Sequence, residues 1–184
     1  MLNRRKVIYL SSEVFIDKTL TMLTDMKKYE HLFVPVDLGI DTGIESGLSP
    51  DEFWLQKIEP KITDVRDCII VFDDAQDSYC PARCRVAIDR GIRTGRHKNI
   101  CTIALFHSIR NGQWTQQILQ SAKHVCLFPR SQKGRVRDYF NTALSLTLNE
   151  SRELTNLLQT TGRAAVVRLH NPVCIIAEKY LRLL

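Results

Sequence analysis

The chain has 184 residues, of which 44% are hydrophobic and 25% charged, and its formal net charge is +6. These values are ordinary for a soluble globular protein, and the length favours a single domain, residues 1–184, with a substantial core. No apolar run approaches the ~20 residues of a membrane span, and the run at residues 7–10 is too short for a signal peptide. The positive charge is compatible with a polyanionic partner but does not require one.

The N-terminal part of the chain predicts a strand, a helix and a loop. Residues 6–10 form a short apolar run typical of a strand, and residues 15–28 carry apolar side chains close to helical spacing. Residues 32–49 contain Pro35 and three glycines, so they predict a loop-rich segment with a short strand at residues 33–36.

Ser49 marks the predicted start of the next helix. It suits the N-cap position, Pro50 suits the first helical position, and Glu52 completes a capping box. We expect this helix to run to about Ile58.

Two adjacent acids, Asp73 and Asp74, follow the most apolar strand of the chain. Four consecutive apolar residues, 69–72, precede them, which predicts a buried strand. The acids then lie where the strand leaves the sheet, the edge at which open α/β sheets bind ligands. Paired acids there can hold Mg²⁺ and orient a water molecule. The alternative is a simple turn or helix cap, in which Asp accepts backbone N–H groups.

A basic helix and a second apolar strand follow these acids. The helix is predicted at residues 81–94, with Gly95 as its C-terminal cap. The strand, residues 100–106, ends in His107 and Ser108. Because two neighbouring strands then end in polar side chains, the pattern favours a site over an isolated turn.

The C-terminal part predicts helices and strands that continue this alternation. We expect a helix capped by Asn149, ending at Gly162, and a hairpin that turns at Pro172. The other predicted elements are helices at residues 113–121 and 131–143 and a strand at 125–128; the hairpin strands are 164–169 and 173–177. Alternating strands and helices predict a three-layer α/β domain with one mainly parallel sheet, to which the hairpin adds an antiparallel edge.

Basic residues gather in two clusters. The first is Arg83, Arg85, Arg90, Arg93 and Arg96, and the second is Arg130, Lys133, Arg135 and Arg137. The second cluster opens a predicted helix, where it can follow a phosphate backbone or face a neighbouring subunit. The alternative is a solvated helix face.

The six cysteines suggest a reducing compartment. With no secretory signal, we expect them to be reduced and the protein to be intracellular. Four lie in apolar strand-like runs and are expected to be buried: Cys68, Cys101, Cys126 and Cys174. A different set has the spacing of a zinc site, which leaves open a zinc-stabilised α/β binding protein: Cys80, Cys84, His97 and Cys101.

Taken together, several motifs resemble the FtsK–HerA branch of P-loop ATPases, which have a RecA-like fold, and in particular the genome-packaging ATPases of large DNA viruses. The resemblance covers roughly residues 6–145. The motifs are Val71-Phe-Asp-Asp74, the basic helix, Gly95-Arg-His-Lys-Asn-Ile100, the strand that ends in a polar pair, and residues 125–128.

The resemblance implies a role for each motif residue. Asp73 would hold the Mg²⁺ that accompanies ATP, and Asp74 would polarise the attacking water, as Walker B acids do. His107 and Ser108 would occupy the sensor position near the γ-phosphate. One arginine, Arg90, Arg93 or Arg96, would act as an arginine finger across a subunit interface.

The resemblance also implies partners. Enzymes of this family work as rings, often hexamers, with double-stranded DNA in the central channel. We therefore expect a homo-oligomeric ring or a partner chain that bears a P-loop, and no membrane association. A viral relative would act in the host cytoplasm or nucleus.

One family motif has no counterpart in this chain. A Walker A loop, Gly-x4-Gly-Lys-Ser/Thr, cradles the phosphates of ATP, but none of the eight glycines here is followed by Lys. The chain begins at what resembles the second strand of the family. We expect it to bind ATP poorly and to hydrolyse it negligibly. It is then either part of an ATPase whose P-loop is encoded or expressed separately, or a catalytically silent RecA-like assembly or DNA-binding module.

Overall fold

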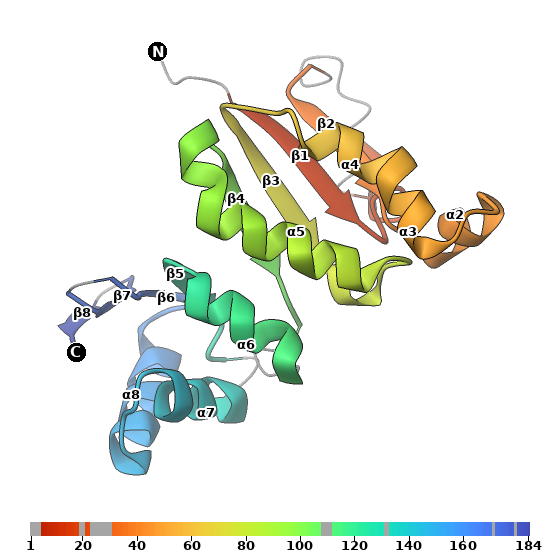
Figure 1. Cartoon of the computed structure of the whole chain (residues 1–184). Helices are drawn as coiled ribbons and strands as arrows, with labels where there is room; N and C mark the ends of the chain where they lie inside the picture. Colours follow the sequence, from red (N-terminus) through yellow and green to blue (C-terminus); the bar gives the residue numbers. More distant parts are fainter. Residues whose placement is uncertain are drawn as a thin grey trace. The chain divides into compact units, whose positions relative to one another are not determined.

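The protein consists of two compact units, residues 1–107 and 108–184, each of which contains its own four-stranded sheet (Figure 1). The computed structural model describes residues 5–18, 21–22, 31–107, 112–130, 133–170, 172–178 and 180–184. One sheet is parallel and the other antiparallel. The predicted α/β class is confirmed, whereas the prediction of one mainly parallel sheet carrying a C-terminal hairpin is wrong.

The first sheet has the strand order β2-β1-β3-β4, and its described pairs are all parallel. Its strands are β1 (Lys6–Ser11), β2 (Phe33–Asp37), β3 (Cys68–Asp73) and β4 (Cys101–Leu105). All four agree with the predicted strands to within about two residues at each end. Because β1 lies between β2 and β3, the chain first builds outward on one side of β1 and then on the other. Ligands of open α/β sheets bind at the carboxyl edge beside such a switch.

The helices of the first unit follow their local capping signals. Ser49 accepts the Glu52 backbone N–H while the Glu52 carboxylate accepts the Ser49 backbone N–H, so the predicted capping box is confirmed. The helical segments are α2 (Ile40–Glu45), α3 (Pro50–Phe53), the π-helical turn η1 (Trp54–Ile58), α4 (Glu59–Ile62), the 3₁₀ turn η2 (Ala75–Asp77), α5 (Pro81–Thr94) and the 3₁₀ turn η3 (Gly95–Lys98).

Three predictions for these helices need comment. The segment predicted as loop contains α2, whose first turn is held by Asp37, since its carboxylate accepts the Gly39 N–H and the Thr42 hydroxyl. Helix α5 ends where predicted, but the helical path continues past Gly95 into η3, and Asn99 takes the left-handed conformation instead. The helix predicted at residues 15–28 falls largely outside the described residues.

The core of the first unit lies between the sheet and α5. Ile8 and Leu10 of β1 are fully buried, as is Ile88 of α5. A Cβ added at Gly91 of α5 would lie 2.5 Å from Thr102 Oγ1 of β4, so the helix and the strand pack at close range. Figure 1 shows that α5 starts near the carboxyl edge of the sheet and ends near the amino edge.

In its described residues, the second unit has an antiparallel sheet, in the order β5-β6-β7-β8, and three helices. Its elements are α6 (Gly112–Ser121), β5 (His124–Leu127), α7 (Lys133–Ala143), α8 (Leu148–Thr161), β6 (Ala165–Arg168), β7 (Cys174–Ala177) and β8 (Tyr180–Leu183). The predicted hairpin is confirmed as β6–β7. However, the strand predicted at residues 125–128 pairs with β6 rather than joining the parallel sheet.

The second unit has a core of its own. Tyr139 and Phe140 of α7 and Leu154 of α8 pack with Leu127 and Val167 of the sheet. The N-cap of α8 is Thr147, not the predicted Asn149, because Thr147 and Glu150 form a reciprocal capping box. No helix among the described residues of either unit is long and apolar enough to cross a membrane.

The cysteines are distributed differently from the prediction. Cys68 and Cys174 are buried as expected, but Cys101 and Cys126 are exposed. Both exposed cysteines belong to strands, β4 and β5, that end their sheets among the described residues. Cys80 and Cys84, which lie outside the strands, are buried instead.

Candidate functional site

Asp74 and His107 meet at the carboxyl edge of the parallel sheet. Asp73 is the last residue of β3 and pairs in register with Leu105 of β4, so the residues that follow these strands leave the sheet side by side. The His107 Nε2 atom lies 3.0 Å from Asp74 Oδ2, although 33 positions separate them in the chain. The structure thus brings two predicted site residues together. Ser108, the third, lies outside the described residues.

The backbone at Asp74 explains where its side chain points. Asp74 has a φ of 48° and a ψ of 33°, the left-handed conformation that Asp tolerates better than most residues. This turn leads from β3 into η2, in which the Asp77 N–H donates to the Asp74 carbonyl. The Asp74 side chain makes no capping hydrogen bond to η2. The Asp74 side chain therefore does not cap the helix, although its backbone does form the turn that leads into η2.

Asp73 is held by a tyrosine on the neighbouring strand. The Tyr9 hydroxyl donates a 2.7 Å hydrogen bond to Asp73 Oδ2. Burial and this hydrogen bond both raise the pKa of Tyr9, and the negative charge of Asp73 adds to the effect. The Tyr9 ring also packs 5.9 Å from the Phe33 ring of β2, centroid to centroid. Tyr9 thereby fixes one oxygen of the Asp73 carboxylate.

Sequence reasoning missed Tyr9. The alternation of side chains along a strand places Tyr9 and Ser11 on one face of β1, and Asp73 lies on the same face of β3 because Ser11 and Asp73 are in register. That register depends on β1 and β3 being neighbours. The residue pattern gave no signal for this pairing.

The acidic edge has the donor atoms that Mg²⁺ prefers. Mg²⁺ is commonly held by one or two carboxylates together with water and substrate phosphates. Asp73 and Asp74 supply such carboxylates from consecutive positions. No cluster of three or more metal-ligating side chains occurs within the described part of the chain. The edge therefore fits a hydrated Mg²⁺ shared with a phosphate ligand better than a metal enclosed by protein.

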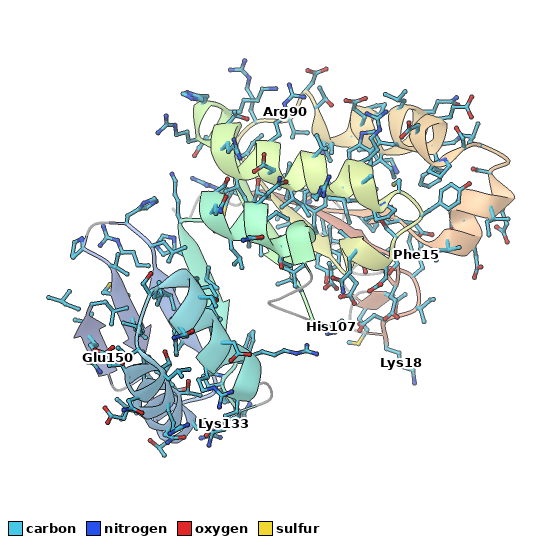
Figure 2. All side chains as sticks on the ribbon, turned by 60° about the horizontal axis from the view of Figure 1, so that its bottom comes forward. Phe15, Lys18, Arg90, His107, Lys133 and Glu150 are labelled. Carbon is cyan, nitrogen blue, oxygen red and sulfur yellow. The ribbon has the colours of Figure 1, made fainter. Side chains whose placement is uncertain are left out.

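The predicted finger arginines lie far from these acids in the same chain. Helix α5 has 14 residues and runs from the carboxyl edge to the amino edge, a length of about 20 Å. Arg93 lies in the last turn of α5, and Arg96 lies in η3, which follows it. Figure 2 shows Arg90 and His107 on opposite sides of the first unit. Arg93 also donates from Nε to Asp89 Oδ1 at 2.9 Å. None of the three can reach Asp74 of its own chain.

The predicted zinc ligands are likewise separated by α5. Cys80 and Cys84 lie at the start of the helix, whereas His97 and Cys101 follow its end. The Cys80 and Cys84 thiols interact with each other, which raises the pKa of Cys80 and lowers that of Cys84. The zinc hypothesis is wrong for this set, because the spacing along the chain does not become proximity in the fold.

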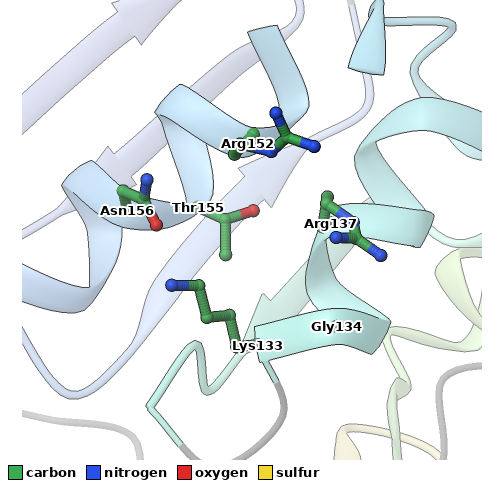
Figure 3. A pocket seen from close by; sticks show the side chains of 6 residues that line it. All are labelled: Lys133, Gly134, Arg137, Arg152, Thr155 and Asn156. Atoms are coloured by element: carbon green, nitrogen blue, oxygen red, sulfur yellow. The ribbon is translucent and has the colours of Figure 1, made fainter. Parts of the chain in front are cut away.

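The second basic cluster divides into separate environments. Arg130 donates from Nε to the Gln159 carbonyl at 3.2 Å, so it ties the loop after β5 to α8. Lys133 and Arg137 line a pocket of about 340 Å³ together with Arg152 of α8, as Figure 3 shows, and Arg135 is not among its lining residues. Sequence reasoning missed Arg152, since only the packing of α7 against α8 places it beside the cluster.

Comparison with protein-family models finds no match to this chain. Searches of curated proteins and of solved structures likewise find no match. The proposals below therefore depend on the geometry described above and on the motif resemblance.

Proposed function

We propose that the first unit is the Walker B half of an ATP-hydrolysing site in a DNA-translocating or DNA-packaging protein of the FtsK–HerA type. Asp73 and Asp74 would hold Mg²⁺ together with the phosphates of ATP. When bound, the ion would neutralise negative charge on the phosphates. Asp74 and His107 would orient the attacking water and contact the γ-phosphate.

The contact between Asp74 and His107 carries this proposal. Two polar side chains from separate motifs lie 3.0 Å apart at the edge where α/β sheets bind ligands. The conformation at Asp74 adds support, since left-handed backbone at a non-glycine residue costs free energy and is concentrated at functional sites.

The open side of β4 supports a site that is completed elsewhere. Strand β4 ends the described sheet, and its residues Ile103 and Leu105 are 40% and 42% exposed. It contains neither a charge nor a proline, the usual protection of an edge strand. Strand β2 at the other end carries Pro35, which has no N–H to offer a further strand. A strand that bears a phosphate loop could therefore pair with β4.

The same open edge favours a second candidate function, a catalytically silent assembly module. In that case a partner strand pairs with β4 without supplying a phosphate loop. Proline at Ala104 would weaken pairing in either case. The two candidates separate on ATP: only an active site completed by the partner gains Mg²⁺-dependent turnover that the Asp74→Asn substitution removes.

Mn²⁺ is a paramagnetic substitute for Mg²⁺ that tests the half-site in the chain alone. Added to the isotope-labelled full chain, it should broaden the backbone NMR signals nearest Asp73, Asp74 and His107. The Asp73→Asn variant should lose this broadening, whereas Asp77→Asn, which removes an acid from the adjacent turn η2, should keep it. Broadening centred elsewhere, or unchanged in Asp73→Asn, would sink the proposal.

Turnover tests the absence of a phosphate cradle. The chain alone should hydrolyse ATP no faster than a double variant, Asp73→Ala with Asp74→Ala. Turnover well above that of the double variant would show that another part of this chain cradles the phosphates.

A further inference from the structure

The pocket between α7 and α8 has an unusual lining. Its six lining residues come from two helices: Lys133, Gly134, Arg137, Arg152, Thr155 and Asn156. Figure 3 shows their side chains arranged around one opening, with α7 on one side and α8 on the other. Three of the six are cationic and none is acidic. The pocket belongs entirely to the second unit.

The spacing of these residues concentrates positive charge. Lys133 and Arg137 are four positions apart on α7, so they share a face of the helix, and Arg152 is contributed by α8. Like charges at this spacing repel each other and weaken an isolated helix by a few tenths of a kcal/mol. An anion placed between the three cations would convert this repulsion into attraction.

Arg137 has a donor that the described protein leaves unused. Its Nε atom is buried and has no hydrogen-bond partner among the described residues. The guanidinium makes one long contact, 3.5 Å from Nη2 to Asp138 Oδ1. Arginine offers several N–H donors in a planar fork that matches the oxygens of a phosphate. The Arg137 side chain as a whole is 41% exposed, so a phosphate in the pocket would meet its terminal Nη groups rather than the buried Nε.

The start of α7 adds backbone donors on the same side. Gly134 is the second residue of this 11-residue helix, and a Cβ built there meets no atom within 4 Å. The first N–H groups of a helix have no partner within the helix and favour an anion. The space beside Gly134 is open, so an anion has room to approach them.

The net charge of the protein resides in the second unit. Residues 108–184 contain eleven Lys and Arg against four Asp and Glu, a net charge of +7, whereas residues 1–107 contain fifteen against sixteen, a net charge of −1. A single small anion gains little from positive charge that is spread over the whole unit. A polyanion does benefit from it, because each neutralised phosphate releases counterions.

We propose that this pocket binds a phosphate of the DNA backbone, held by Lys133, Arg137 and Arg152. The pocket supplies the DNA contact of the function proposed above and rests on that function for the identity of the polyanion. Its test reads binding rather than hydrolysis or metal binding. Failure of the pocket would therefore leave the half-site of the first unit untouched, and the converse also holds.

Fluorescence anisotropy with a labelled DNA duplex, measured on the full chain over a range of salt concentrations, tests this assignment. Arg137→Gln and Arg152→Gln should each weaken binding about tenfold or more, since hydrogen bonds to charged groups are worth about 1.5–3 kcal/mol. Each should also lower the salt dependence of binding, by at most about one phosphate contact because the three cations share one phosphate. Lys133→Gln provides a third variant, because Lys133 is exposed and its loss leaves the packing of the unit intact.

Matched controls separate the pocket from overall charge. Arg163→Gln and Arg182→Gln remove one exposed positive charge each from the same unit, outside the pocket. They should weaken binding much less than the pocket variants. Equal losses in both groups would show that binding follows net charge alone, and salt-independent binding, or none, would also overturn the proposal.

A competition arm identifies the source of the phosphate. Inorganic phosphate and a mononucleotide should displace the duplex only weakly, because neither uses the field of the whole unit. If the pocket variants lose binding of inorganic phosphate but bind the duplex as the unaltered chain does, the pocket serves a small phosphate compound, and the DNA assignment is wrong.

Discussion

The hydroxyl of Tyr9 donates a 2.7 Å hydrogen bond to Oδ2 of Asp73, which joins β1 to β3 at the acidic edge of the sheet. One of the two strands on which the proposed site depends is thus held in place by a side chain of its neighbour. This bond makes the geometry of Asp73 dependent on β1, a strand that carries none of the motif residues.

Replacing Tyr9 by Phe removes this donor and keeps the ring. We expect the free energy of unfolding to fall by about 1.5–3 kcal/mol, because the lost hydrogen bond ends on a charged carboxylate. Tyr79→Phe is the matched control, since the Tyr79 hydroxyl donates to the neutral carbonyl of Leu48 at 2.8 Å. Denaturant unfolding of both variants measures the difference, and an equal or larger loss in Tyr79→Phe would contradict a charge-assisted bond at Asp73.

Tyr9 and Tyr139 should ionise later than an ordinary tyrosine. Burial raises the pKa of Tyr139 to about 12, and burial together with Asp73 raises that of Tyr9. A pKa that is higher in the folded state contributes stability that is fully present below the unfolded value of about 10 and is lost as the pH rises above it.

Tyrosinate absorbance, followed together with circular dichroism, checks this prediction. While the protein remains folded, Tyr9 and Tyr139 should stay neutral above the ordinary titration range of tyrosine. Tyr9→Phe should remove one of these late titrations. Ionisation of all five tyrosines near the ordinary value, with the fold intact, would show that Tyr9 and Tyr139 are more accessible to water than their positions indicate.

Glycine at Asp74 tests whether the backbone there is strained for the sake of the site. Asp74 and Ser145 both have a positive φ, 48° and 56°. Ser145→Gly should raise the free energy of unfolding by up to about 1 kcal/mol, since glycine adopts this conformation without a Cβ clash. Asp74→Gly should gain less, because it also loses the contact with His107, whose side chain is 79% exposed.

The two glycine variants should differ in metal binding as well as in stability. Asp74→Gly should reduce the effect of Mn²⁺ at the acidic edge, and Ser145→Gly should not. A loss of more than about 1 kcal/mol in Asp74→Gly, with the effect of Mn²⁺ unchanged, would identify Asp74 as a structural residue.

Alanine at Gly91 should separate α5 from β4. Glycine to alanine inside a helix normally stabilises it by about 1 kcal/mol. Here the added methyl would lie 2.5 Å from Thr102 Oγ1, so we expect a net destabilisation of about 1–3 kcal/mol. Thr102→Ala removes the clashing atom, which has no hydrogen-bond partner among the described residues. The double variant should therefore recover most of the loss, and strictly additive effects in thermal unfolding would argue against this contact.

Glutamine at Glu150 should change how stability depends on pH. The Thr147 hydroxyl and backbone N–H both donate to the Glu150 carboxylate and lower its pKa. A pKa that is lower in the folded state contributes stability that is present above the unfolded value of about 4.3 and is lost as the pH falls through the folded value. Glu150→Gln should therefore show a shallower loss of melting temperature in acid, and Glu153→Gln, on an exposed position of the same helix, should behave as the unaltered chain does.

Local chemistry accounts for the features that could be predicted. The bounds of α5 agree with Pro81 at its start, the capping box at Ser49 forms as expected, and the apolar run before Asp73 is a buried strand. Each of these depends on residues within a few positions of one another. Local pairs of this kind, such as Ser49 with Glu52, do not depend on strand order or on contacts with distant segments.

Features that depend on distant partners could not be predicted in this way. Strand β5 has the composition of a buried parallel strand, yet it pairs with β6 through contacts such as Val125 opposite Val167. Cys101 lies in an apolar run but is exposed, because β4 is the last strand in the described part of its sheet. The four residues whose spacing is typical of a zinc site form two pairs, and the length of α5 separates one pair from the other.

From residue order alone it follows that two acids leave a buried strand and that a histidine leaves the next one. The meeting of Asp74 with His107, the hold of Tyr9 on Asp73 and the joining of Arg152 to Lys133 and Arg137 come from folding. The reason is physical: hydrogen bonds and helix caps act over a few residues, whereas strand order and helix packing minimise the exposed apolar surface of the entire unit.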